Sequence, residues 1–67
     1  MLHSFEIDVT GASQKDIAML QDKLERYMYE PPARIHDIGD VQFMTFESEH
    51  PLTNEIVNLP PPYRLKD

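Results

Sequence analysis

Hydrophobic and polar residues alternate along residues 3–10. Phe5, Ile7 and Val9 fall on one side of an extended chain, and polar residues occupy the positions between them. A period of two is typical of a β-strand with one buried face. We therefore predict a strand here, which ends before Gly11.

Residues 13–29 have a different period. Their apolar positions recur at spacings of three and four residues, namely Ile17, Leu20, Leu24, Tyr27 and Met28. This spacing predicts an amphipathic helix with its apolar side on a core. Ser13 is a suitable N-cap, and Pro31 with Pro32 ends the helix. We predict a helix from Ser13 to about Tyr29.

Residues 34–49 are rich in strand-forming residues. Gly39 and Asp40 interrupt them as a turn or a bulge, which favours two strands, Arg34–Ile38 and Val41–Ser48. The second strand has apolar residues on both of its faces. One helix covers only one face of a sheet, so we expect the C-terminal segment, a second copy or a partner to cover the other face.

The predicted fold class is α+β, with a single β-α-β-β domain at residues 1–58. It has a three-stranded sheet with one helix packed on one face. Residues 53–59 are expected to form a short edge strand or one helical turn. Pro60–Pro62 predicts a polyproline II conformation, so residues 59–67 are expected to be an extended Pro-rich tail.

The chain is acidic and contains no cysteine. Twelve Asp and Glu residues outnumber six Lys and Arg residues, which gives a net charge of −6. Clustered basic residues are needed to neutralise phosphates, so we expect no direct nucleic-acid binding. A protein partner with a basic surface is the better match. The absence of cysteine and of a long apolar run predicts a cytoplasmic protein without a membrane contact.

The sequence does not favour an enzyme, a metal site or a cofactor. His3, His36 and His50 lack the spacing of zinc or calcium motifs. Glu6 and Asp8 are paired carboxylates on the outward face of the first strand, but acid–base catalysis by such a pair requires a cleft that raises one pKa. We expect no catalytic residues, no metal and no cofactor.

Two groups of residues are candidates for binding a partner. The acidic candidates of the strand regions are Glu6, Asp8, Asp37, Asp40, Glu47 and Glu49. The apolar candidates are Phe43, Met44 and Phe46, because methionine and aromatic side chains are enriched at interfaces. The alternatives are an ordinary solubilising surface for the first group and core packing for the second.

The segment Pro60, Pro61, Pro62 and Tyr63 resembles a PPxY ligand of WW domains over these four residues. The resemblance implies an adaptor role for the tail. The alternative is a stiff strap, anchored by Leu59, Tyr63 and Leu65, which covers the open face of the sheet.

These features predict a small non-enzymatic protein-binding module that acts as a regulator or inhibitor. Compact, acidic, cysteine-free chains of this size occur among phage and plasmid proteins that block host machinery, which is an analogy only. The alternatives are a homo-oligomeric structural or assembly subunit, of which a homodimer is the simplest form, and an adaptor that binds a WW-like domain through its tail.

Overall fold

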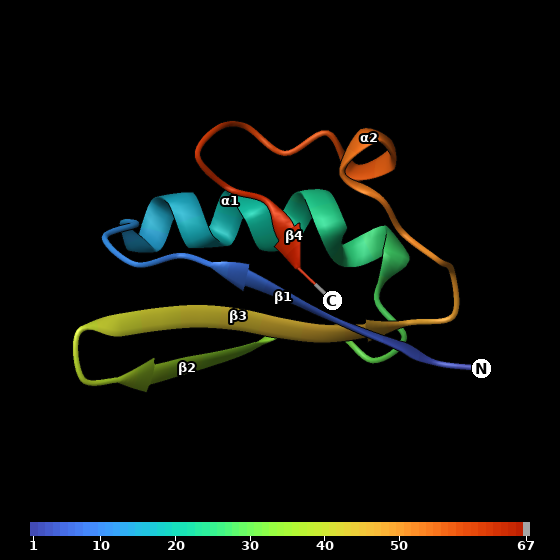
Figure 1. The fold of residues 1–67 in the computed structure, drawn as a ribbon, viewed down its shortest axis with the longest axis horizontal. Coiled ribbons are helices and arrows are strands. Elements are labelled where there is room, and N and C mark those ends of the chain that lie inside the picture. The colour runs from blue at the N-terminus through green and yellow to red at the C-terminus, as the bar shows by residue number, and fades with distance from the viewer. Residues whose placement is uncertain (67) are drawn as a thin grey trace.

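The protein has an α+β fold in which the helices lie on one side of a single sheet (Figure 1). The computed structural model describes residues 1–66. Its elements in chain order are β1 (His3–Asp8), α1 (Gln14–Leu24), the 3₁₀-helical turn η1 (Glu25–Tyr27), β2 (Arg34–Ile38), β3 (Val41–Ser48), α2 (Asn54–Val57) and β4 (Leu65–Lys66).

The sheet has four strands rather than the three predicted. Its order is β2-β3-β1-β4, and every neighbouring pair is antiparallel. The central pair is β1 with β3, in which Phe5 lies opposite Phe46 and Ile7 opposite Met44. The additional strand, β4, comes from the segment predicted to be an extended tail.

The β2–β3 hairpin confirms the two predicted strands, and of the two alternatives between them it contains a turn and not a bulge. Ile38 pairs with Val41, so the loop contains only Gly39 and Asp40. Gly39 has a φ of +63°, which glycine adopts at no steric cost. A glycine with positive φ at the first loop position is typical of the type II′ turn, whose twist matches that of the two strands.

Helix α1 begins as predicted and ends earlier than predicted. The Ser13 hydroxyl accepts a hydrogen bond from the Asp16 amide at 3.1 Å, which caps the first turn. After η1 the chain becomes extended at Met28, whose side chain is buried in the core. The Tyr29 amide then donates to the Glu47 carbonyl at 2.8 Å. Core packing and this bond to β3 therefore end the helix before the prolines do.

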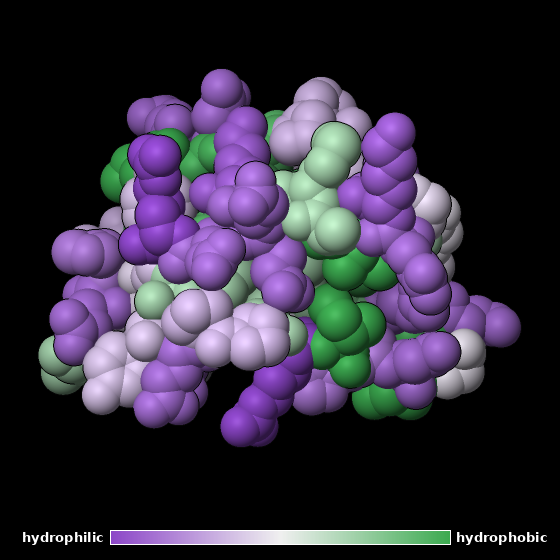
Figure 2. Space-filling model, turned by 180° about the vertical axis from the view of Figure 1, so that it is seen from behind, coloured by the Kyte–Doolittle hydropathy of each residue, from purple (hydrophilic) through white to green (hydrophobic). Residues whose placement is uncertain are grey.

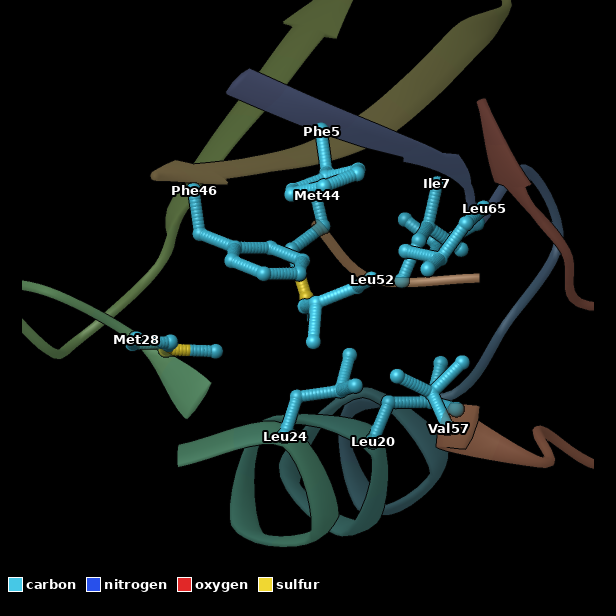
Figure 3. Packing of buried hydrophobic residues seen from close by; sticks show 11 residues of the cluster. Phe5, Ile7, Leu20, Leu24, Met28, Met44, Phe46, Leu52, Val57 and Leu65 are labelled. Carbon is cyan, nitrogen blue, oxygen red and sulfur yellow. The ribbon is translucent and has the colours of Figure 1, made fainter. Parts of the chain in front are cut away.

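The hydrophobic core lies between α1 and the sheet (Figure 3). Phe5, Ile7, Met44 and Phe46 point from the strands towards the helix. Leu20 and Leu24 of α1 and Val57 of α2 form the opposite wall. Leu52 lies between the two layers, and Leu65 of β4 lies beside Ile7 on the sheet side. Burying each of these side chains stabilises the fold by about 1.5–3 kcal/mol before the cost of ordering is subtracted.

The Pro-rich segment is a turn and not a polyproline II extension. The Tyr63 amide donates to the Pro60 carbonyl at 3.0 Å, which reverses the chain. Tyr63 is half-buried against the core, and Leu65 is buried next to it in β4. The Asn54 side chain holds β4 in place by accepting a hydrogen bond from the Leu65 amide at 2.8 Å.

The C-terminal segment does act as a strap, but on the helix side of the sheet. Figure 1 shows it passing over α1 before it enters the sheet. The Lys23 ammonium donates to the Asn58 carbonyl at 2.7 Å, which joins the segment to α1. The other face of the sheet, which the strap was predicted to cover, receives no helix or strand from residues 1–66.

Candidate interaction surface

The sheet face that points away from α1 is the candidate site, and we call it the open face. Strand pairing assigns to it alternate residues of each strand, namely Ser4, Glu6, Asp8, Arg34, His36, Ile38, Val41, Phe43, Thr45, Glu47 and Lys66. None of these side chains is buried. The open face is therefore the largest part of the sheet that is accessible to a partner.

The open face is polar at one end and apolar at the other. Strand register places Arg34, Thr45, Glu6 and Lys66 in one row across all four strands. The cations Arg34 and Lys66 thus occupy the two ends of this row, and the anion Glu6 lies between them. The apolar end lies beside the β2–β3 turn, where Ile38 faces Val41.

Four residues at the apolar end form what we call the hairpin patch: His36, Ile38, Val41 and Phe43. Ile38 is 65% exposed and Val41 is 48% exposed. The His36 ring stacks on the Phe43 ring with their centroids 4.8 Å apart. A hydrogen bond of 2.9 Å joins His36 Nε2 to Thr45 Oγ1. The two rings are therefore held in place, while Ile38 and Val41 remain uncovered.

Acidic residues flank the hairpin patch. Asp8 lies opposite Phe43 on the open face, and Asp40 is in the exposed turn. Asp37 is in β2 with its side chain on the helix side, where Gln42 Nε2 donates to Asp37 Oδ2 at 3.5 Å. The surroundings of the patch therefore favour a ligand with basic groups next to an apolar one.

Asp8 has a lowered pKa. The main cause is the Thr10 amide, which donates to Asp8 Oδ1 at 2.9 Å. The Thr10 hydroxyl and the positive charge of Lys66 lower the pKa further. Hydrogen bonds and nearby cations stabilise the carboxylate form, so Asp8 keeps its negative charge to lower pH than an ordinary aspartate.

The structure separates the six acidic candidates instead of joining them in one acidic strip. Glu6 and Glu47 are on the open face, but Arg34 and Lys66 share that region. Glu49 follows the end of β3. Only Asp8, Asp37 and Asp40 lie at the hairpin end.

The three apolar candidates fall on opposite faces of β3. Met44 is fully buried and Phe46 is 7% exposed, because both point into the core. Phe43 is half-buried on the open face. Of this group, only Phe43 belongs to an accessible surface, and the alternative of core packing holds for Met44 and Phe46.

His36, Ile38 and Val41 were not among the site residues predicted from the sequence. A usable signal was present, because a two-residue turn at Gly39 and Asp40 places Ile38 directly opposite Val41. Alternation along each strand then brings His36 opposite Phe43. The sequence left a turn and a bulge both open at Gly39 and Asp40, and only the two-residue turn predicts the patch.

Residues 1–66 contain His, Asp and Glu side chains, which are common ligands of metal ions. No three His, Cys, Asp or Glu side chains of this part of the chain come together in a way that could hold a metal ion. Glu6 and Asp8 lie on the open face, and Asp8 also borders a solvent-open pocket next to Thr10 and Lys66. None of the helices in this range has the length and the apolar character needed to cross a membrane.

Comparisons with protein-family models, with curated proteins and with solved structures found no match to this chain.

Proposed function

We propose that this protein is a small protein-binding module that uses the hairpin patch of its open face to hold a partner. The observation that carries the proposal is the exposure of Ile38 and Val41 on a sheet face without a covering element within residues 1–66. Exposed apolar groups with a polar rim are typical of protein interaction sites.

The chemistry around the patch indicates the kind of partner. Phe43 and Val41 offer an apolar contact, and Asp8 with Asp40 adds negative charge at its border. The whole chain carries a net charge of −6, which attracts basic surfaces over a longer range. The proposed partner therefore presents an apolar side chain surrounded by Lys or Arg.

Such binding suits a regulator or inhibitor that covers a basic surface of another protein. The proposal does not require the Pro-rich segment. Tyr63 packs on the core and the Pro60–Tyr63 turn is closed by a hydrogen bond. A WW-like domain would have to detach and extend this segment, which makes the adaptor role the less favoured alternative.

The test compares two variants with the same change in charge. Val41→Lys places a cation within the patch, whereas Ile56→Lys places one on α2, where Ile56 is 53% exposed. Tagged wild type and both variants are used for affinity capture with mass spectrometry at low and high salt. We expect Val41→Lys to weaken capture of the partner by about tenfold or more, because a like charge at an interface costs at least 1.4 kcal/mol.

The Ile56→Lys variant should capture the same partner as the wild type. Capture should also decrease as salt rises, because salt screens attraction between the acidic chain and a basic surface. Equal capture by all three proteins, or capture that salt does not change, would contradict the proposal. Circular dichroism of each variant verifies that the fold is intact.

A further inference from the structure

Strand β2 is an accessible edge of the sheet and contributes only His36 and Ile38 to the hairpin patch. It is the first strand in the order β2-β3-β1-β4, so one side of its backbone has no neighbouring strand within residues 1–66. Ile35, on the helix side, is 43% exposed, and Ile38 on the open face is 65% exposed. Figure 2 views the molecule from the side on which β2 lies and shows a stripe of hydrophobic surface among hydrophilic groups.

The turn determines which backbone groups of β2 point outwards. In a two-residue hairpin, the residues on either side of the turn form a hydrogen-bonded pair, here Ile38 and Val41. Hydrogen-bonded and non-hydrogen-bonded positions alternate along an antiparallel pair. The N–H and C=O groups of Ile35 and Asp37 therefore point away from β3, towards the free edge.

The outward N–H and C=O groups of one β2 strand match those of a second, antiparallel β2 strand. We infer that a second copy of this chain adds its β2 to the β2 edge in antiparallel orientation, with the two-fold axis at His36. Ile35 then pairs with Asp37 of the second copy, and Asp37 pairs with Ile35 of the second copy. Both residues can exchange N–H···O bonds with their opposite residue, so all the outward groups of β2 are satisfied.

The charges of the edge favour a second copy over a basic partner. Within β2, Arg34 and Asp37 carry opposite charges, so the strand is balanced while the whole chain has a net charge of −6. The proposed register places Arg34 next to Ile38 of the second copy, where the side-chain stem of Arg34 can cover the isoleucine. In this register no Asp, Glu, Lys or Arg of β2 lies directly opposite a residue of like charge, and each His36 ring lies over Phe43 of its own β3.

The dimer is expected to be weak. The β2 strand has only five residues, which is a short contact compared with a stable interface. The net charge of each copy also repels the other, so salt at about 0.15 M should aid association by screening. Association of the purified full chain should therefore be measured by sedimentation equilibrium up to about 1 mM, the range for weak encounters.

Two substitutions at Ile38 test the register. Ile38→Lys places a cation beside Arg34 of the second copy, whereas Ile38→Glu places an anion there. We expect Ile38→Lys to weaken the dimer by about tenfold or more, and Ile38→Glu to retain it. Net charge alone predicts the reverse, because the lysine variant is the less acidic of the two. Adding Arg34→Glu to Ile38→Lys should restore the dimer.

A cross-link provides a second measurement. The chain has no cysteine, so His36→Cys introduces a single thiol at the proposed two-fold axis. The two copies of residue 36 form a non-hydrogen-bonded pair, whose Cα separation of about 4.5 Å is suitable for a disulfide. Mild oxidation should link His36→Cys into covalent dimers. Ser4→Cys, which is exposed on β1 of the same face, should remain largely unlinked.

The inference does not depend on the proposed function, because these experiments use the purified chain without a partner. It is overturned if the wild type is monomeric up to about 1 mM. Equal dimerisation of Ile38→Lys and Ile38→Glu, or equal cross-linking of the two cysteine variants, also overturns the proposed register.

Discussion

At the scale of single residues, short polar contacts fix the hairpin end of the sheet. Asp8 accepts a hydrogen bond from the Thr10 amide at 2.9 Å, which turns the chain at the end of β1. The Thr10 hydroxyl in turn accepts from the Gln42 amide at 3.0 Å. These contacts join the end of β1 to the start of β3 and hold Asp8 next to the hairpin patch.

The lowered pKa of Asp8 makes stability depend on pH. Because the folded state has the lower pKa, the contribution of Asp8 is present above its unfolded pKa near 3.8 and is lost as pH falls through the folded value. Urea unfolding between about pH 7 and about pH 2 measures this effect. We expect Asp8→Asn to have a flatter stability curve than the wild type below about pH 5.

Asp40→Asn is the control, since it makes the same change of charge in the exposed turn. Because Asp8 is still present, the free energy of unfolding of Asp40→Asn should decrease with falling pH as it does in the wild type. If the Asp8 and Asp40 variants have the same pH dependence, the hydrogen bond from Thr10 does not stabilise the folded state as argued.

At the scale of elements, the C-terminal segment becomes structured through a side chain that belongs to another element. Asn54, the first residue of α2, bonds to both backbone groups of Leu65 in β4. The side-chain amide of Asn54 thus bonds to the backbone of Leu65 as a neighbouring strand would. Leu65 can then lie buried beside Ile7, although β4 has only two residues.

Asn54→Ala should therefore release β4. The loss of two hydrogen bonds should lower the free energy of unfolding by about 1–2 kcal/mol. Hydrogen exchange at the Leu65 amide should accelerate more than exchange in β3. Glu55→Ala, at an exposed neighbouring position of α2, is the control and should leave exchange in β4 unchanged. Equal exchange in both variants would show that Asn54 does not hold the strand.

At the scale of the whole molecule, the C-terminal segment completes the core. Leu59 and Tyr63 pack against the core cluster, and Leu65 is part of it. A chain of 67 residues buries a smaller fraction of its surface than a larger domain, so each apolar contact is a large share of the total. The fold therefore depends on both ends of the chain.

A chain that ends at Asn58 should be strongly destabilised. Loss of Leu65 burial alone costs about 2–5 kcal/mol, and the free energy of unfolding of a domain this size is roughly 3–10 kcal/mol. Circular dichroism and urea unfolding should show a lower midpoint or an unfolded chain at 25 °C. The full chain with Arg64→Ala, an exposed position of the same segment, should unfold like the wild type. An unchanged midpoint after truncation would contradict this role of the segment.

The amino-acid sequence by itself determined where three of the strands and the main helix lie. Alternation predicted β1, and the positions of Gly39 and Asp40 predicted the β2–β3 hairpin. The three- and four-residue spacing predicted α1 and its core residues Leu20 and Leu24. These features follow from local periodicity and turn chemistry, which depend only on residues close together in the sequence.

Only the tertiary structure decided which strands are neighbours and therefore what the open face contains. Pairing of β1 with β3 joins residues far apart in the sequence and places Asp8 opposite Phe43. Together with the pairing of β2 and β4, it sets Arg34 and Lys66 in one row with Glu6. It also turned Met44 and Phe46 into the core and drew Leu65 into a fourth strand. Periodicity assigns a side chain to a face of its own strand, but the neighbours on that face depend on register and packing across the whole sheet.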